Sequence, residues 1–150
     1  MPVGIDIIVR SSDSTDVKLV VETKMAVNRL ATVEEQLKKS MFHLSCPVGL
    51  LITPEKMWAY VDRYVSTDAS SIQAVGEFTI THLLRYKHTG NERSAEDGRR
   101  FESAVQQWLE ALPRTATREN VADEKLWDLL NKYVLPAVET GEVRAAAPRH

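Results

Sequence analysis

Two stretches near the start of the chain decide its fold: GIDIIVR, residues 4–10, and KLVVETK, residues 18–24. Both are rich in β-branched residues, which favour strands, and the polar run SSDSTD between them is typical of a turn. The sequence therefore predicts two adjacent antiparallel strands. Because side chains alternate between the two faces of a strand, Glu22 and Lys24 emerge on one face, and the hairpin brings Asp6 close to both.

Asp6, Glu22 and Lys24 are ionisable side chains at the end of an otherwise apolar hairpin. Taken singly, each is explained by a surface acid or by an exposed cross-strand charge pair. Together they form a chemically consistent group, because two nearby carboxylates raise one another's pKa and a lysine or a metal cation removes that penalty. Mg²⁺ prefers oxygen ligands and typically takes one or two carboxylates. The group therefore indicates a site for a divalent cation.

A helix and a buried strand are expected to follow the hairpin. Thr32 is a suitable N-cap, with Glu34 and Glu35 in the first turn, and the helix is expected to stop near Ser45. One face of that helix is apolar through Val33, Leu37, Met41 and Leu44. The apolar run over 48–53 is typical of a strand buried on both faces. A right-handed crossover then predicts that it runs parallel to the second hairpin strand.

The rest of the chain predicts further strands and helices. These are strands over 57–65 and 72–78, the second at a sheet edge, a short helix over 79–84, a long helix over 94–112 ended by Pro113, and a last helix that Asp123 caps. Pro136 is expected to end or kink that last helix. Residues 113–122 have no periodicity and are expected to be a linker, and residues 142–150 a frayed tail.

These elements predict an α/β (α+β) fold with a mixed central sheet, the hairpin, a crossover helix and two C-terminal helices. The length of 150 residues fits one domain. We divide it into a core over 1–112 and a helical extension of the same domain over 113–150. The last two helices carry no chemical motif, and they either pack on the sheet or form the interface of a dimer.

Composition limits the classes of partner. No apolar run approaches the roughly 20 residues that span a bilayer, so no membrane partner is expected. The single cysteine, Cys46, excludes an internal disulfide, and we expect a cytoplasmic protein. The chain has no glycine-rich phosphate loop and hence no expected nucleotide cofactor. With a net charge of −2, contact with nucleic acid would depend on local patches. Those patches are Arg29 with Lys38 and Lys39, and a basic run over 82–100.

The hairpin resembles the PD-(D/E)XK nuclease superfamily over roughly residues 4–65. The family's first aspartate corresponds to Asp6, and its acidic-x-Lys triplet to Glu22-Thr23-Lys24. The resemblance implies a restriction endonuclease-like core and a Mg²⁺ or Mn²⁺ ion. The ligands it implies are Asp6, Glu22 and the backbone carbonyl of Thr23, and it gives Lys24 the role of assisting the attacking water.

Two departures from the family pattern bear on the site and on assembly. In several branches the helix after the triplet carries a glutamine followed four residues on by a tyrosine. Gln36 matches the first position and Ser40 departs from the second, so Gln36 is either a catalytic-site residue or a solvent-facing side chain. The family usually places a helix and a strand before the aspartate strand. Either the chain is a minimal or truncated version of the fold, or a second subunit covers the edge strand that is left exposed, and we expect a homodimer.

The resemblance implies a Mg²⁺-dependent endonuclease, a hydrolase of DNA phosphodiester bonds. The alternative is a catalytically inactive protein of the nuclease fold that serves as an interaction or assembly module, with its C-terminal helices as the interface.

Overall fold

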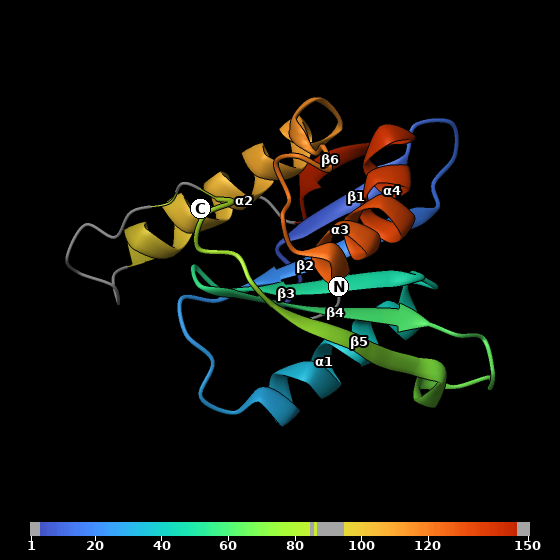
Figure 1. Ribbon diagram of the computed structural model, residues 1–150. Helices are drawn as coiled ribbons and strands as arrows, with labels where there is room; N and C mark the ends of the chain where they lie inside the picture. Colours follow the sequence, from blue (N-terminus) through green and yellow to red (C-terminus); the bar gives the residue numbers. More distant parts are fainter. Residues whose placement is uncertain (1–3, 85, 87–94, 147–150) are drawn as a thin grey trace.

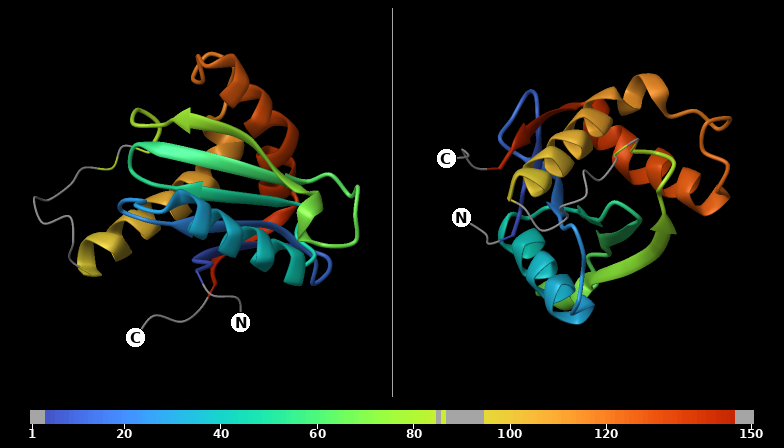
Figure 2. Two further views of the ribbon diagram at one scale, coloured as in Figure 1. Left: turned by 90° about the horizontal axis from the view of Figure 1, so that it is seen from below. Right: turned by 90° about the vertical axis from the view of Figure 1, so that its left-hand side faces the viewer.

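The computed structural model describes residues 4–84, 86 and 95–146, in three layers (Figure 1). A six-stranded sheet in the described residues has the order β5-β4-β3-β2-β1-β6. Helix α1 covers one face, and α2, α3 and α4 cover the other (Figure 2). The predicted α/β class with a mixed central sheet is confirmed. The strands are β1 (Ile7–Ser11), β2 (Val17–Thr23), β3 (Val48–Ile52), β4 (Lys56–Asp62), β5 (Ile72–Thr79) and β6 (Gly141–Ala145).

The predicted hairpin is confirmed. β1 and β2 pair antiparallel with Ile7 opposite Val21 and Ile8 opposite Val20. Helix α1 (Leu30–His43) then crosses over, and β3 pairs parallel to β2, as expected from its continuous apolar run. β4 and β5 add antiparallel, and β5 forms one edge of the sheet.

Helix α1 begins earlier than its capping pattern predicts. Its N-cap is Arg29, which makes no side-chain capping hydrogen bond, and the predicted N-cap Thr32 lies inside the first turn. The extra residues bring Leu30 against the core on the α1 face. Partial burial of Leu30 removes apolar surface from water, so packing favours the earlier start of this helix.

Two further helix boundaries differ from the sequence prediction. Residues 81–83 form a turn and not a helix, because the Ile80 N–H is bonded to the carbonyl of Glu55 and continues the strand pairing. Helix α2 (Ala95–Thr115) continues through Pro113. Proline removes one helical hydrogen bond, but the Ala116 N–H still reaches the carbonyl of Leu112 at 2.8 Å, so the last turn forms.

The last helical segment widens where it was expected to end or kink. Asp123 caps α3 (Glu124–Leu129) as predicted, accepting from the Leu126 N–H at 3.1 Å. The next turn, η2 (Leu130–Val134), is a π-helix in which the Leu135 N–H donates to the carbonyl of Leu130. Pro136 in α4 (Leu135–Glu139) has no N–H to continue the regular pattern, so the chain takes a wider turn before it.

The expectation of a frayed tail over 142–150 is wrong for the residues that the structure describes. β6 pairs antiparallel with β1, and the Ala146 N–H donates to the carbonyl of Asp6 at 2.8 Å. Residues 147–150 lie outside the described part. Because the C-terminal segment covers β1, the reason given for a homodimer no longer holds, and dimerisation stays a prediction without that support.

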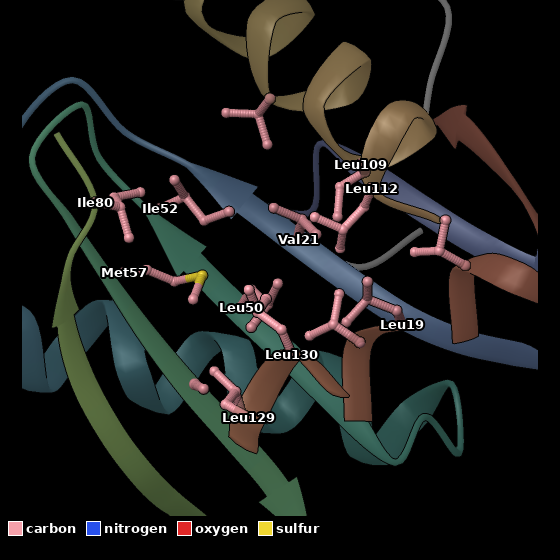
Figure 3. Packing of buried hydrophobic residues seen from close by; sticks show 14 of the residues in the cluster. Leu19, Val21, Leu50, Ile52, Met57, Ile80, Leu109, Leu112, Leu129 and Leu130 are labelled. Carbon is pink, nitrogen blue, oxygen red and sulfur yellow. The ribbon is translucent and has the colours of Figure 1, made fainter. Parts of the chain in front are cut away.

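The sheet separates two apolar cores. Leu19, Val21, Leu50 and Ile52 face α2 and η2, where Leu109, Leu112 and Leu130 meet them (Figure 3). On the other face Leu37 and Met41 of α1 pack on Val20, Leu51 and Tyr60. The C-terminal helices therefore pack on the sheet, the first of the two arrangements expected for them. No helix of the described residues is long and apolar enough to cross a membrane.

Gly141 starts β6 at a point where no side chain fits. A Cβ there would lie 2.6 Å from the carbonyl oxygen of Arg10 and 2.8 Å from that of Ala137, whereas a Cβ at Gly98 in α2 meets nothing within 4 Å. We expect Gly141→Ala to lower the free energy of unfolding by roughly 1–3 kcal/mol, because backbone atoms must shift.

The matched control, Gly98→Ala, should raise the free energy of unfolding by about 0.5–1 kcal/mol, because glycine is unfavourable inside a helix. Urea unfolding followed by circular dichroism measures both. Equal stability of the two variants would contradict the close packing of β6.

Candidate functional site

The predicted ionisable residues meet where the hairpin ends. Glu22 is near the end of β2, and Lys24 follows that strand directly. The Lys24 Nζ lies 3.6 Å from the Glu22 Oε1, and the two side chains differ sharply in exposure, at 43% and 1%. The pair therefore joins a buried carboxylate to a cation that reaches solvent.

Glu22 is buried without hydrogen-bond donors. Neither of its carboxylate oxygens has a hydrogen-bond partner among the described residues. Gly4, at a φ of 92°, covers the carboxylate so closely that a Cβ there would lie 2.7 Å from Oε1. Only glycine adopts this backbone conformation readily, and only glycine leaves the space. Burying a carboxylate in this way is unfavourable unless the group is protonated or bound to a cation.

The electrostatics of Glu22 follow from that burial. Burial raises the pKa of the Glu22 carboxyl from its ordinary value to about 7. The charge of Lys24 opposes this rise, and the charge of Asp6 adds to it. A carboxyl with this pKa is poised between its two protonation states near neutral pH, and a bound cation would favour the ionised form.

Asp6 is fixed by the residue that follows Glu22. Its Oδ2 accepts hydrogen bonds from the Thr23 N–H at 2.8 Å and from the Thr23 hydroxyl at 3.0 Å. The backbone N–H of Asp6 donates to the carbonyl of Val21 at 2.9 Å. The Asp6 carboxylate then accepts from the Thr23 N–H, where a backbone carbonyl would accept in a regular strand pair. The structure thus brings together Asp6, Glu22, Thr23 and Lys24. The hydrogen bond from the Thr23 hydroxyl to Asp6 was not foreseen from the sequence.

Gln36 does not join this group. Its side chain is exposed on α1, and no hydrogen bond or ion pair in the described part of the chain joins it to the hairpin residues. Glu34 lies closer to the sheet, where its Oε2 accepts a hydrogen bond from the hydroxyl of Tyr60 at 2.7 Å. Tyr60 is fully buried, and its pKa is raised by burial and by the negative charges of Glu34 and Glu22. Glu34 could not be singled out from its sequence pattern, because its hydrogen bond with Tyr60 depends on where α1 lies over β4.

The basic patches predicted for nucleic acid are only partly described. Lys39 pairs with Glu35 at 3.6 Å on the exposed side of α1. Much of the second patch, residue 85 and residues 87–94, lies outside the described residues. Cys46 is buried, and burial raises the pKa of its thiol to about 12.

The hairpin end offers a few oxygen ligands of the kind that a hard divalent cation prefers. Across residues 4–84, 86 and 95–146, no three His, Cys, Asp or Glu side chains are placed to hold a metal together. A cation held by Asp6, Glu22 and a backbone oxygen would keep several waters, as Mg²⁺ commonly does. The two buried Glu22 oxygens that lack donors are the observation that supports this fit.

Fold and site define the class of this protein as a three-layer α/β domain with a buried carboxylate and a lysine at the end of a central hairpin. No family model matches the chain, and no curated protein or solved structure was found to be similar to it.

The raised pKa of Glu22 predicts a pH dependence of stability in metal-free buffer. The folded state binds the Glu22 proton more tightly than the unfolded state does, so protonation of Glu22 stabilises the fold. This stabilisation is complete below pH 4.5 and is lost as the pH rises through about 7. Across that window the loss is on the order of 3 kcal/mol.

Glu22→Gln keeps the shape of the side chain and removes the charge. Urea unfolding at a series of pH values with a chelator present should show a steeper loss of stability in the wild type than in this variant. Parallel curves for the two proteins would contradict the raised pKa.

Proposed function

We propose that this protein is a Mg²⁺-dependent (or Mn²⁺-dependent) nuclease that hydrolyses DNA phosphodiester bonds at the hairpin end. The observation that carries the proposal is the Glu22 carboxylate, which is buried near Asp6 and Lys24 and has no hydrogen-bond donor among the residues that the structure describes. A purely structural acid would be expected to have donors, whereas a metal ligand is satisfied by its cation. The resemblance of the hairpin to the PD-(D/E)XK nucleases points the same way.

Each residue has a distinct part in this proposal. Asp6 and Glu22 would hold the metal, with the backbone carbonyl of Thr23 beside them. When bound, the metal supplies Lewis-acid stabilisation of the charge that develops on the phosphate. The hydrogen bonds from Thr23 keep the Asp6 carboxylate from rotating away.

Lys24 is suited to contact the attacking water. It is the partly exposed member of the group, and its Nζ is held near the site by Glu22 at 3.6 Å. An ammonium in that position orients a water and stabilises negative charge as it forms. Lys24 is therefore accessible to a phosphate that arrives from solvent.

Two observations favour the second candidate function, a catalytically inactive nuclease-fold protein acting as an interaction or assembly module. Gly4 shields Glu22 from solvent, and the Asp6 carboxylate already accepts two hydrogen bonds from Thr23. Both contacts are those expected of residues that fasten the end of the hairpin. The two functions differ in whether this site binds a metal.

Titration with Mg²⁺ and Mn²⁺, followed by thermal unfolding and by plasmid nicking, tests the proposal. In the wild type the metal should raise the melting temperature in a saturable manner and support nicking. Glu22→Gln should lose both effects. Lys24→Ala should still bind metal but nick at least about 100-fold more slowly, because it loses charge stabilisation in the transition state.

Glu119→Gln serves as the control, since it removes one exposed carboxylate far along the chain from the hairpin. It should behave as the wild type. Nicking at full rate in Lys24→Ala, or metal stabilisation that persists in Glu22→Gln, would overturn the proposed site. A folded wild type with neither metal binding nor nicking would favour the inactive module.

A further inference from the structure

A groove separates the edge strand β5 from the helical segment formed by α3 and η2. It lies on the face of the sheet opposite α1, and its volume is about 410 Å³. This volume falls in the range of pockets that hold small organic ligands. The floor is apolar and is formed by Val75, Phe78 and Leu129. The groove is separate from the hairpin site, because none of the hairpin residues lines it.

Three cations line the rim of this groove: Arg63, Lys125 and Lys132. None of them forms an ion pair with an acid of the described residues. Arg63 and Lys132 both contact Tyr133. The Arg63 Nη1 donates to the Tyr133 hydroxyl at 3.4 Å, and the Lys132 Nζ lies 5.4 Å from the centroid of the Tyr133 ring. The three positive charges therefore remain available to an anion.

Two carboxylates also line the groove, but they do not neutralise it. Glu77 pairs with Lys56 at 3.5 Å. Asp128 is left as one negative charge against three positive ones. The groove is thus a local cationic site on a protein whose net charge is −2.

The wide turn of η2 contributes two of the lining residues. Lys132 and Tyr133 both belong to this π-helix, which forms because Pro136 cannot donate the next helical hydrogen bond. Such turns are less stable than a regular helix and occur often at functional sites. The helix geometry is therefore altered at the point where a cation and a hydroxyl line the groove.

We propose that this groove binds the phosphate of a nucleotide, with the base or sugar on its apolar floor. A phosphate offers three oxygens and up to two negative charges, which match three separate cations better than a single carboxylate does. The planar guanidinium of Arg63 binds two phosphate oxygens in parallel, and each lysine contributes a point charge. The nucleotide is either free or part of a DNA strand, and both offer the same phosphate chemistry.

Binding of AMP, measured by isothermal titration calorimetry in phosphate-free buffer with a chelator, tests the proposal. Adenosine and inorganic phosphate represent the two halves of the ligand, and a short single-stranded DNA oligonucleotide represents the polymer. AMP should bind more tightly than either half. The triple variant Arg63→Gln, Lys125→Gln, Lys132→Gln should bind at least roughly tenfold more weakly, because it loses charge-assisted hydrogen bonds to phosphate.

The matched control is Lys18→Gln, Arg114→Gln, Arg144→Gln, which changes the net charge equally at positions outside the groove. It should bind AMP nearly as the wild type does. Asp128→Asn should tighten binding, because it removes the negative charge on the rim. A gain of affinity is a result that loss of structure does not produce.

Binding of AMP that depends on the three cations supports a site for a free nucleotide. Binding of the oligonucleotide alone, with the same dependence, supports a site for the phosphates of a DNA strand. The proposal is overturned if neither binds, or if the groove triple variant binds as tightly as its control. Because no metal is present in these measurements, they fail or succeed independently of cleavage at Glu22.

Discussion

The antiparallel pairing of β1 with β2 is the interaction on which the rest of the structure depends. It places Val21 and Leu19 on one face and Val20 on the other, and so creates the two surfaces on which α1 and the C-terminal helices pack. The same register sets Asp6 beside the end of β2. Because the side-chain period of a strand is two, a slip of one residue would move Glu22 to the opposite face. Fold and site therefore share one constraint.

Burial of Glu22 opposes the stability that this strand pairing provides. Its carboxylate is buried beneath Gly4 and lacks hydrogen-bond donors in the described part of the protein, so the hairpin carries an unfavourable charge where it ends. Lys24 offsets part of that cost at 3.6 Å. Residues that reduce stability in this way are expected where a site has a function, because a ligand then supplies the missing interaction. The further contacts of Asp6 with Thr23 hold the arrangement in place without a metal.

The C-terminal third of the chain has two structural tasks. It covers the sheet with α2, α3, η2 and α4, and it returns through β6 to pair with β1. β6 covers the edge that β1 would otherwise expose. Just after β6, the Ala146 N–H donates a hydrogen bond to the carbonyl of Asp6 and so joins the C-terminal segment to the hairpin end. The cationic groove beside β5 arises from the same helical cover, because η2 directs Lys132 and Tyr133 toward the sheet edge.

Elements whose signals are local could be predicted from the amino-acid sequence alone. The hairpin, the parallel β3 and the cap at Asp123 follow from β-branched runs, a continuous apolar stretch and a single capping side chain. The grouping of Asp6, Glu22 and Lys24 follows from the strand period. Three features depend on tertiary packing: the start of α1 at Leu30, the passage of α2 through Pro113 and the strand β6. Each depends on a distant partner: the core beneath Leu30, the sheet beneath Leu112, and the edge of β1. Glu34 and the groove cations became visible for the same reason, because burial and proximity across the sheet are properties of the packed chain and not of its local pattern.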